Sequence, residues 1–133
     1  MFEWNERYSV GIGSIDAQHQ TLFRLGAELH AAMTSGQGKA ASGKILGRLI
    51  QYTASHFAHE ERLMRQHDYS GMAAHKAEHD ALTKQVLQFQ SDFESGNATI
   101  TVQLLHFLKN WLTHHIDGSD KRYAPYFKDK AVA

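Results

Sequence analysis

The stretch HFAHEERLMRQHDYSGMAAHKAEH, residues 56–79, contains the pattern that decides the fold. Apolar residues recur at helical spacing on both sides of a polar segment that is typical of a turn. His56 and Glu60 lie before the turn, and His75 and His79 lie after it. Each pair is separated by four residues, about 40° more than a full helical turn, so its members share one helix face. The stretch predicts two antiparallel helices, each carrying two metal-ligand side chains.

Outside this stretch, the same apolar periodicity predicts two more long helices. The first helix should run from about 17 to 35, with Asp16 as its N-cap, and the second from about 44 to 67. The third should cover about 72–94. The fourth should start near Thr99 and loosen at Asp117 and Gly118, followed by a short helical segment within 121–130. Short connections favour antiparallel neighbours in an up-down-up-down arrangement.

Residues 1–15 have no helical period, and Gly11 and Gly13 disfavour a helix there. We therefore expect an extended N-terminal arm that packs on the bundle through its apolar side chains, which are Phe2, Trp4, Tyr8, Val10 and Ile12. The predicted fold is all-α: an antiparallel up-down-up-down four-helix bundle with this arm. We expect one domain over residues 1–133, with the arm at 1–15 and the bundle and C-terminal segment at 16–130.

Composition excludes several classes of protein. Formal net charge is zero with histidine neutral, which argues against nucleic acid or an acidic membrane held by bulk electrostatics. The chain has no cysteine, which excludes disulfides, thiolate metal sites and iron–sulfur clusters. It shows no signal peptide and no run of apolar residues long enough to span a membrane, so we expect a cytoplasmic protein without a membrane partner. The unusual count is histidine, at 10 of 133 residues.

Metal-ligand residue types fall in one layer of the predicted bundle. In an antiparallel hairpin, residues equidistant from the turn lie side by side. This relation holds for His19 with His56, for His56 with His75, and for His79 with His115 across the three connections. Histidines placed at random would not share a layer. The candidate metal ligands are His19, His56, Glu60, His75, His79, His115 and Asp120.

Asp120 is the least regular candidate. It follows His115 by five residues, about 140° around an ideal α-helix, so the two side chains would not face the same way. The metal-site interpretation therefore requires a π-like bulge or a broken turn between them. Gly118, a poor helix former, lies inside that segment.

The types of ligand indicate the metal. Imidazoles and carboxylates without thiolates suit iron and fit a structural zinc poorly. Seven protein ligands are too many for one ion. If two six-coordinate irons share two bridging carboxylates and one bridging oxygen, one coordination position stays open, and it can bind one small ligand such as dioxygen.

Four segments carry a resemblance to a known family: IDAQH (15–19), HFAHEE (56–61), HKAEH (75–79) and WLTHHIDGSDKRY (111–123). With the N-terminal FEWNERYSVGI, they make the chain resemble the hemerythrins, most closely the prokaryotic members. The resemblance implies two iron ions (Fe²⁺/Fe³⁺) with an oxo or hydroxo bridge, and reversible dioxygen binding rather than enzyme activity. It implies that one iron is held by His75, His79 and His115, that the other, which has the open position, is held by His19 and His56, and that Glu60 and Asp120 bridge them.

The open position should face an apolar wall that keeps out water. Leu112 precedes His115 by three residues and so lies on nearly the same helix face; Phe57 and Leu22 are further candidates for this oxygen pocket. The other five histidines are given no metal role: His30, His59, His67, His106 and His114.

Two other functions stay open. A di-iron enzyme (a ferroxidase, oxygenase or peroxidase) is the main alternative, although the Glu-x-x-His pairs of ferritin-like enzymes do not occur in this sequence. The other alternative is a helical interaction module without metal. Oxygen carriage, storage and sensing are not distinguished, and an unidentified protein partner stays open.

Overall fold

The computed structural model describes residues 2–36, 39–96 and 102–127, and the regular elements of this part are all helical. The four long helices are α1 (Gly13–Thr34), α2 (Lys39–Gln66), α3 (Met72–Glu94) and α4 (Val102–His114). The three short elements are η1 (Glu6–Tyr8), a 3₁₀ turn; η2 (His115–Asp120), a π-helix; and α5 (Lys121–Phe127).

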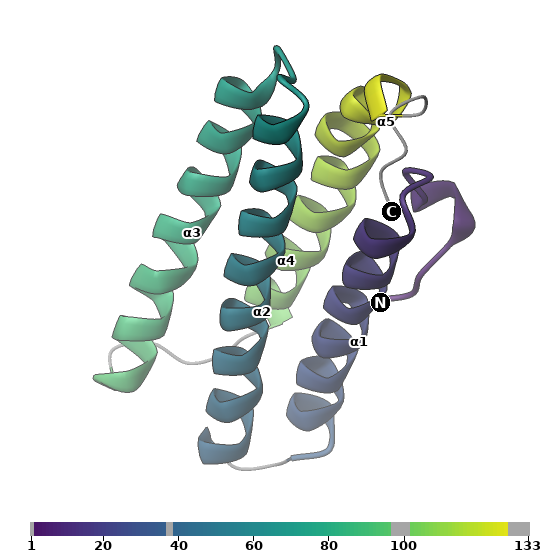
Figure 1. Ribbon diagram of the computed structural model, residues 1–133. Helices are drawn as coiled ribbons and strands as arrows, with labels where there is room; N and C mark the ends of the chain where they lie inside the picture. The colour runs from purple at the N-terminus through teal and green to yellow at the C-terminus, as the bar shows by residue number, and fades with distance from the viewer. Residues whose placement is uncertain (1, 37–38, 97–101, 128–133) are drawn as a thin grey trace.

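The long helices run side by side and alternate in direction along the chain (Figure 1). Helix α1 packs against α2 and α4, and α2 packs against α3. This arrangement confirms the predicted all-α, up-down-up-down four-helix bundle. The α2–α3 turn, the start of α1 and the end of α4 all lie at one end of the bundle (Figure 1). No helix in the described ranges is both long enough and apolar enough to cross a membrane.

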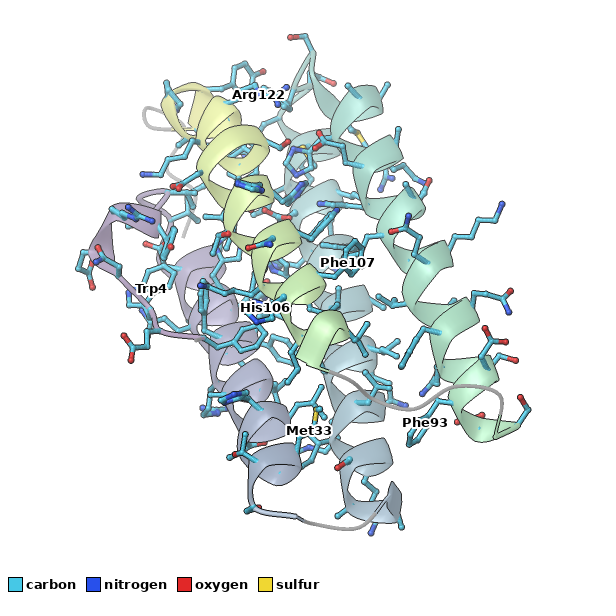
Figure 2. The ribbon with its side chains drawn as sticks, turned by 180° about the vertical axis from the view of Figure 1, so that it is seen from behind. Trp4, Met33, Phe93, His106, Phe107 and Arg122 are labelled. Carbon is cyan, nitrogen blue, oxygen red and sulfur yellow. The ribbon has the colours of Figure 1, made fainter. Side chains whose placement is uncertain are left out.

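The interior away from that end is apolar. One cluster joins buried leucines of α1 and α2 to the arm and to α4, and it includes Leu22, Leu25, Leu29, Leu46, Leu49 and Leu105. Met33 and Phe93 lie toward the far end of the bundle from Arg122 (Figure 2). Burial of these side chains supplies the main favourable free energy of folding, at roughly 25 cal/mol for each Å² of apolar surface.

The N-terminal arm packs on the bundle as predicted, with four of its five apolar side chains buried: Phe2, Tyr8, Val10 and Ile12. Trp4 is only partly buried and meets the Phe23 ring edge-on at 5.9 Å. Phe2 lies directly over Gly26 of α1, where a Cβ would stand 2.4 Å from a ring carbon of Phe2. The glycine is therefore needed for this close approach of the arm.

The predicted start of the first helix was wrong. Helix α1 begins at Gly13, and its N-cap, Ile12, makes no side-chain capping bond. Asp16 lies one turn into the helix, where its carboxylate accepts hydrogen bonds from the Ser9 hydroxyl at 2.5 Å and from the Val10 amide at 2.9 Å. These bonds fasten the arm to the first turn of α1, so Asp16 stabilises the arm instead of capping the helix.

Helix α2 also starts earlier than predicted, at Lys39 and not near residue 44. Gly43, which precedes the predicted start of this helix, lies inside it. A Cβ at this position would stand 2.8 Å from the Phe93 ring, so the glycine permits close packing of α2 on α3. The predicted start of the fourth helix near Thr99 lies outside the described residues.

Candidate metal centre

The seven predicted ligand residues meet at the bundle end that holds the α2–α3 turn. They come from α1 (His19), α2 (His56 and Glu60), α3 (His75 and His79) and η2 (His115 and Asp120). Every one of these residues is buried, with an exposed fraction of 5% or less. Charged and polar side chains are rarely buried this completely unless they have partners. The structure thus brings together the histidines that the layer argument selected and the two carboxylates of Glu60 and Asp120.

The π-helix η2 explains how Asp120 joins the cluster. Its wider i→i+5 turn allows residues five apart to share a face. His115 and Asp120 are the first and last residues of η2, and the His115 Nε2 lies 3.2 Å from the Asp120 Oδ1. The predicted π-like distortion between these two residues is therefore confirmed.

The potential ligand atoms form two overlapping groups. The three-histidine group consists of His75, His79 and His115 with both carboxylates, and the two-histidine group consists of His19 and His56 with the same carboxylates. Within each group the ligand atoms all lie within 4.8 Å of one another. Glu60 and Asp120 belong to both groups, which is the arrangement that two metal ions with bridging carboxylates require.

Asp120 divides its two oxygens between the groups. Its Oδ1 lies 3.0 Å from the His75 Nε2, while its Oδ2 lies 3.1 Å from the His19 Nε2. The Glu60 Oε1 lies 3.3 Å from the Nε2 atoms of both His56 and His79. Each carboxylate therefore contacts imidazoles of both groups.

Several buried polar atoms at this centre have no hydrogen-bond partner among the described residues. They are both ring nitrogens of His19, the Nε2 of His75, the Nδ1 of His115, the Oε1 of Glu60 and both oxygens of Asp120. Leaving buried polar groups unpaired is costly, and metal coordination would satisfy most of these atoms at once. Nitrogen and carboxylate oxygen donors without thiolate suit iron. The residues present therefore fit the expected metal centre.

The electrostatics of the metal-free cluster favour ionised carboxylates. Burial and the neighbouring Asp120 both oppose ionisation of Glu60, but His56, His75 and His79 outweigh them and hold the pKa of Glu60 below its usual value. Burial opposes ionisation of Asp120 too, yet its contacts with surrounding imidazoles keep its pKa well below the ordinary one. The two negative charges are thus retained at neutral pH and attract cations.

The imidazoles divide into protonated and neutral rings. Burial disfavours the charged form of His75, but its contacts with Asp120 and Glu60 prevail and raise its pKa to about 9. For His56, burial dominates and lowers the pKa to about 4. Protons on His75 therefore balance carboxylate charge in the metal-free protein, and a metal ion must displace them.

We expect metal affinity to rise with pH between 7 and 9. His75, with a pKa of about 9, is protonated at pH 7 and cannot ligate until it loses its proton. Each displaced proton makes the apparent affinity rise roughly tenfold per pH unit below that pKa. Titration of the metal-free protein with Co²⁺ at a series of pH values measures the slope. An affinity that does not change over this range would contradict the assignment of His75.

Tyr123 of α5 is a further member of the site that the sequence did not reveal. Its side chain is fully buried, and its hydroxyl donates a hydrogen bond to the Glu60 Oε2. Burial, reinforced by the nearby carboxylates, raises the pKa of Tyr123 well above its usual value, so the hydroxyl keeps its proton. Tyr123 therefore links the C-terminal helix to the bridging carboxylate.

Replacing Tyr123 with phenylalanine should destabilise the metal-free protein by about 1–3 kcal/mol, because a buried carboxylate oxygen loses its donor. Urea unfolding of the metal-free protein measures this loss. Tyr52→Phe, at a partly buried tyrosine of α2 away from the cluster, provides the control and should change stability less. Equal unfolding free energies for the two variants would show that the Tyr123 hydroxyl does not support Glu60.

An apolar cavity of about 40 Å³ lies within the leucine core, and its walls include Leu22, Phe57 and Leu112, the three residues predicted for an oxygen pocket. Phe57 stacks on the ligand candidate His79 with ring centroids 3.7 Å apart. Trp111, which also lines the cavity, stacks on His115 at 4.4 Å. The cavity therefore borders the three-histidine group through these two aromatic rings.

The other histidines lie outside both groups of potential ligands. His59 contacts the Ser14 hydroxyl at 3.0 Å and so links α2 to α1. His67 meets Phe127 edge-on near the α2–α3 turn. His114 and His106 are exposed, and Figure 2 shows His106 beside Phe107 on the outer side of α4.

Four long helices around buried imidazoles and carboxylates define a helical-bundle protein with a metal-binding cluster. Residues 10–127 match the family model described as the Hemerythrin HHE cation binding domain. The chain belongs to the hemerythrin family.

Named relatives cover most of the chain. A bacteriohemerythrin of Stenotrophomonas maltophilia is 38% identical over 94% of this chain and 80% of its own length. A bacteriohemerythrin of Methylococcus capsulatus is 36% identical over 89% of each protein. A crystal structure of wild-type hemerythrin superimposes with a TM-score of 0.87 and 36% identity, over 92% of this chain and 95% of that one. The sequence matches and the structural match therefore indicate the same family and the same four-helix fold.

Proposed function

We propose that this protein binds dioxygen reversibly at a centre of two iron ions. The observation that carries the proposal is the pair of overlapping ligand groups that share Glu60 and Asp120. In this proposal His75, His79 and His115 would hold one iron, His19 and His56 would hold the other, and Glu60 and Asp120 would serve both. When bound, the iron pair would supply the two electrons that dioxygen accepts.

The protein itself contributes rigidity and a dry environment. Ligand side chains come from four elements whose packing fixes them, so the geometry exists before metal or oxygen arrives. The apolar cavity lies behind Phe57 and Trp111, whose rings stack on His79 and His115, and its walls are apolar apart from Thr53. Its volume of about 40 Å³ suits a diatomic molecule and is too small for an organic substrate. This size argues against an oxygenase that acts on an organic substrate in this cavity, and the test below addresses ferroxidase and peroxidase activity.

The test is cycling between argon and air. The protein is reconstituted anaerobically with ferrous iron, and its absorption spectrum is followed as air is admitted and removed. A new spectrum that appears under air and disappears under argon over repeated cycles supports reversible binding. Conversion to a stable ferric form in the first cycle, with turnover of added peroxide or ferrous iron, would support the enzyme alternative instead.

Replacing Leu112 with aspartate should accelerate autoxidation of the reconstituted protein. The new carboxylate would bring water and protons into an apolar wall, and irreversible oxidation depends on proton access. The rate in air, followed optically, should rise by on the order of tenfold or more, whereas Leu112→Met should change it little. An unchanged rate in the aspartate variant would remove Leu112 from the oxygen pocket.

We propose that the bundle functions as one domain over residues 1–133. Oxygen carriage, storage and sensing would share the same centre, and a separate protein partner would distinguish sensing from the other two. The expected cytoplasmic location and the expected lack of nucleic-acid binding rest on the sequence alone. Cell fractionation and a nucleic-acid binding assay test these two expectations.

A further inference from the structure

The outward-facing nitrogens of the ligand histidines have different partners in the two groups. In the three-histidine group, the His79 Nδ1 lies 2.9 Å from the Glu61 Oε2. In the two-histidine group, the His56 Nδ1 lies 2.7 Å from the Gln18 Oε1. A carboxylate therefore contacts a histidine of the three-histidine group, whereas a neutral amide contacts a histidine of the two-histidine group.

These contacts fix which nitrogen of each ring faces the centre. Because Glu61 is an acceptor, the Nδ1–H of His79 donates to it, which leaves Nε2, 3.3 Å from the Glu60 Oε1, as the nitrogen that a metal ion would meet. Gln18 orients His56 in the same way through its amide oxygen. Glu61 and Gln18 are therefore equivalent in geometry and different in charge.

A second carboxylate lies behind the three-histidine group. The Glu78 Oε1 is 3.5 Å from the His115 Nδ1. The buried Ser119 of η2 donates its hydroxyl to the Glu78 carboxylate, at 2.6 and 2.7 Å from the two oxygens, and Arg122 donates to the Ser119 hydroxyl at 3.3 Å. The π-helix that directs Asp120 inward thus also holds Glu78 in place.

Of the two carboxylates behind the three-histidine group, Glu61 should affect metal binding more than Glu78. Its side chain is 15% exposed, against 41% for Glu78, so solvent screens its charge less. A carboxylate at the outer nitrogen makes imidazole a stronger donor and stabilises positive charge on the metal more than an amide does. The two positions should consequently differ in metal affinity, and the partners of their imidazoles add to the effect of their different numbers of imidazoles.

We propose that Glu61 is a positioning residue that makes the three-histidine position the tighter of the two, so that metal fills this position first, and that Gln18 keeps the two-histidine position weaker. This inference rests on the ligand assignment of the proposed function. Glu61 and Gln18 contact ligand histidines and would not contact the metal ions themselves.

The experiment is a titration of the metal-free protein with Co²⁺ alone, followed by visible absorption and by calorimetry. The wild-type protein should bind two ions in two resolved steps. Glu61→Gln, which keeps the shape and the acceptor oxygen, should weaken the first step by roughly 10–100-fold and alter its visible bands, with a smaller change in the second. Glu94→Gln, at an exposed position at the end of α3, removes the same charge and should change neither step.

The converse variant, Gln18→Glu, tests whether the charge beside the outer nitrogen sets metal affinity or whether these residues only stabilise the fold. It should tighten the second step, a gain of affinity that damage to the fold would not produce. Equal weakening of both steps by Glu61→Gln, or no gain from Gln18→Glu, would overturn the inference while leaving the two-metal centre standing. A wild-type protein that binds fewer than two Co²⁺ ions would overturn both proposals.

Discussion

Replacing Asp120 with alanine is expected to reduce bound iron from two ions per chain to one or none. Asp120 directs one oxygen toward His75 and the other toward His19, so it is the side chain that joins the two groups most directly. Losing it removes a ligand from each position and leaves protonated imidazoles without their counter-charge. The affinity loss should exceed the roughly 10–100-fold that is typical when a residue behind a ligand is changed.

Anaerobic reconstitution followed by iron analysis measures the effect of this substitution. The matched control is Asp117→Ala, because Asp117 lies in the same π-helix but is exposed. This control should retain two ions per chain. If the Asp120 variant also retained two ions with unchanged affinity, the bridging assignment would be wrong.

Removing the metal should lower the thermal stability of the protein markedly. The metal-free centre holds buried polar atoms without partners, and metal binds the native state, whose ligands are already assembled. Metal at about 100 times its dissociation constant adds roughly 2.7 kcal/mol to the free energy of unfolding. For a chain of this size, the expected decrease in Tm on removal is on the order of 10 °C.

Thermal unfolding followed by circular dichroism, with and without a chelator, measures this decrease. Hydrogen exchange should show the largest loss of protection in η2 and α5, because Asp120 and Tyr123 connect these short elements to the centre. The Asp120→Ala variant should respond to the chelator much less than the wild type. Identical melting curves for the wild type with and without bound metal would contradict a structural contribution of the centre.

The sequence predicted the helices and the residues that cluster at the candidate centre because both depend on spacing within helices. The pairs His56/Glu60 and His75/His79 occupy common faces, and the shared layer follows from the near-equal distances of these residues from the turns. The irregular spacing of His115 and Asp120 was equally informative, since only a distorted turn lets both join the cluster, and η2 is that turn.

Other features depend on tertiary contacts that no local pattern encodes. Glycine is a poor helix former, yet Gly43 lies inside α2, where the Phe93 ring packs against it. Asp16 has the chemistry of an N-cap but bonds to the arm. In both cases a long-range contact overrides local propensity, which shifts helix boundaries without changing the fold.

The residues behind the ligands were missed for the same reason. Gln18, Glu61 and Tyr123 are joined to the cluster across helices, and their residue types are common on helix surfaces. The adjacency of Glu60 and Glu61 was the available signal, because a second carboxylate about 100° further around α2 can reach a neighbouring helix. Sequence spacing alone did not assign it a partner.

The most direct test is a crystal structure of the protein reconstituted anaerobically with ferrous iron, with anomalous diffraction recorded at the iron absorption edge. We predict two iron peaks per chain, one among His75, His79 and His115 and the other beside His19 and His56, with Glu60 and Asp120 contacting both. A single peak, or iron bound away from these side chains, would contradict the account.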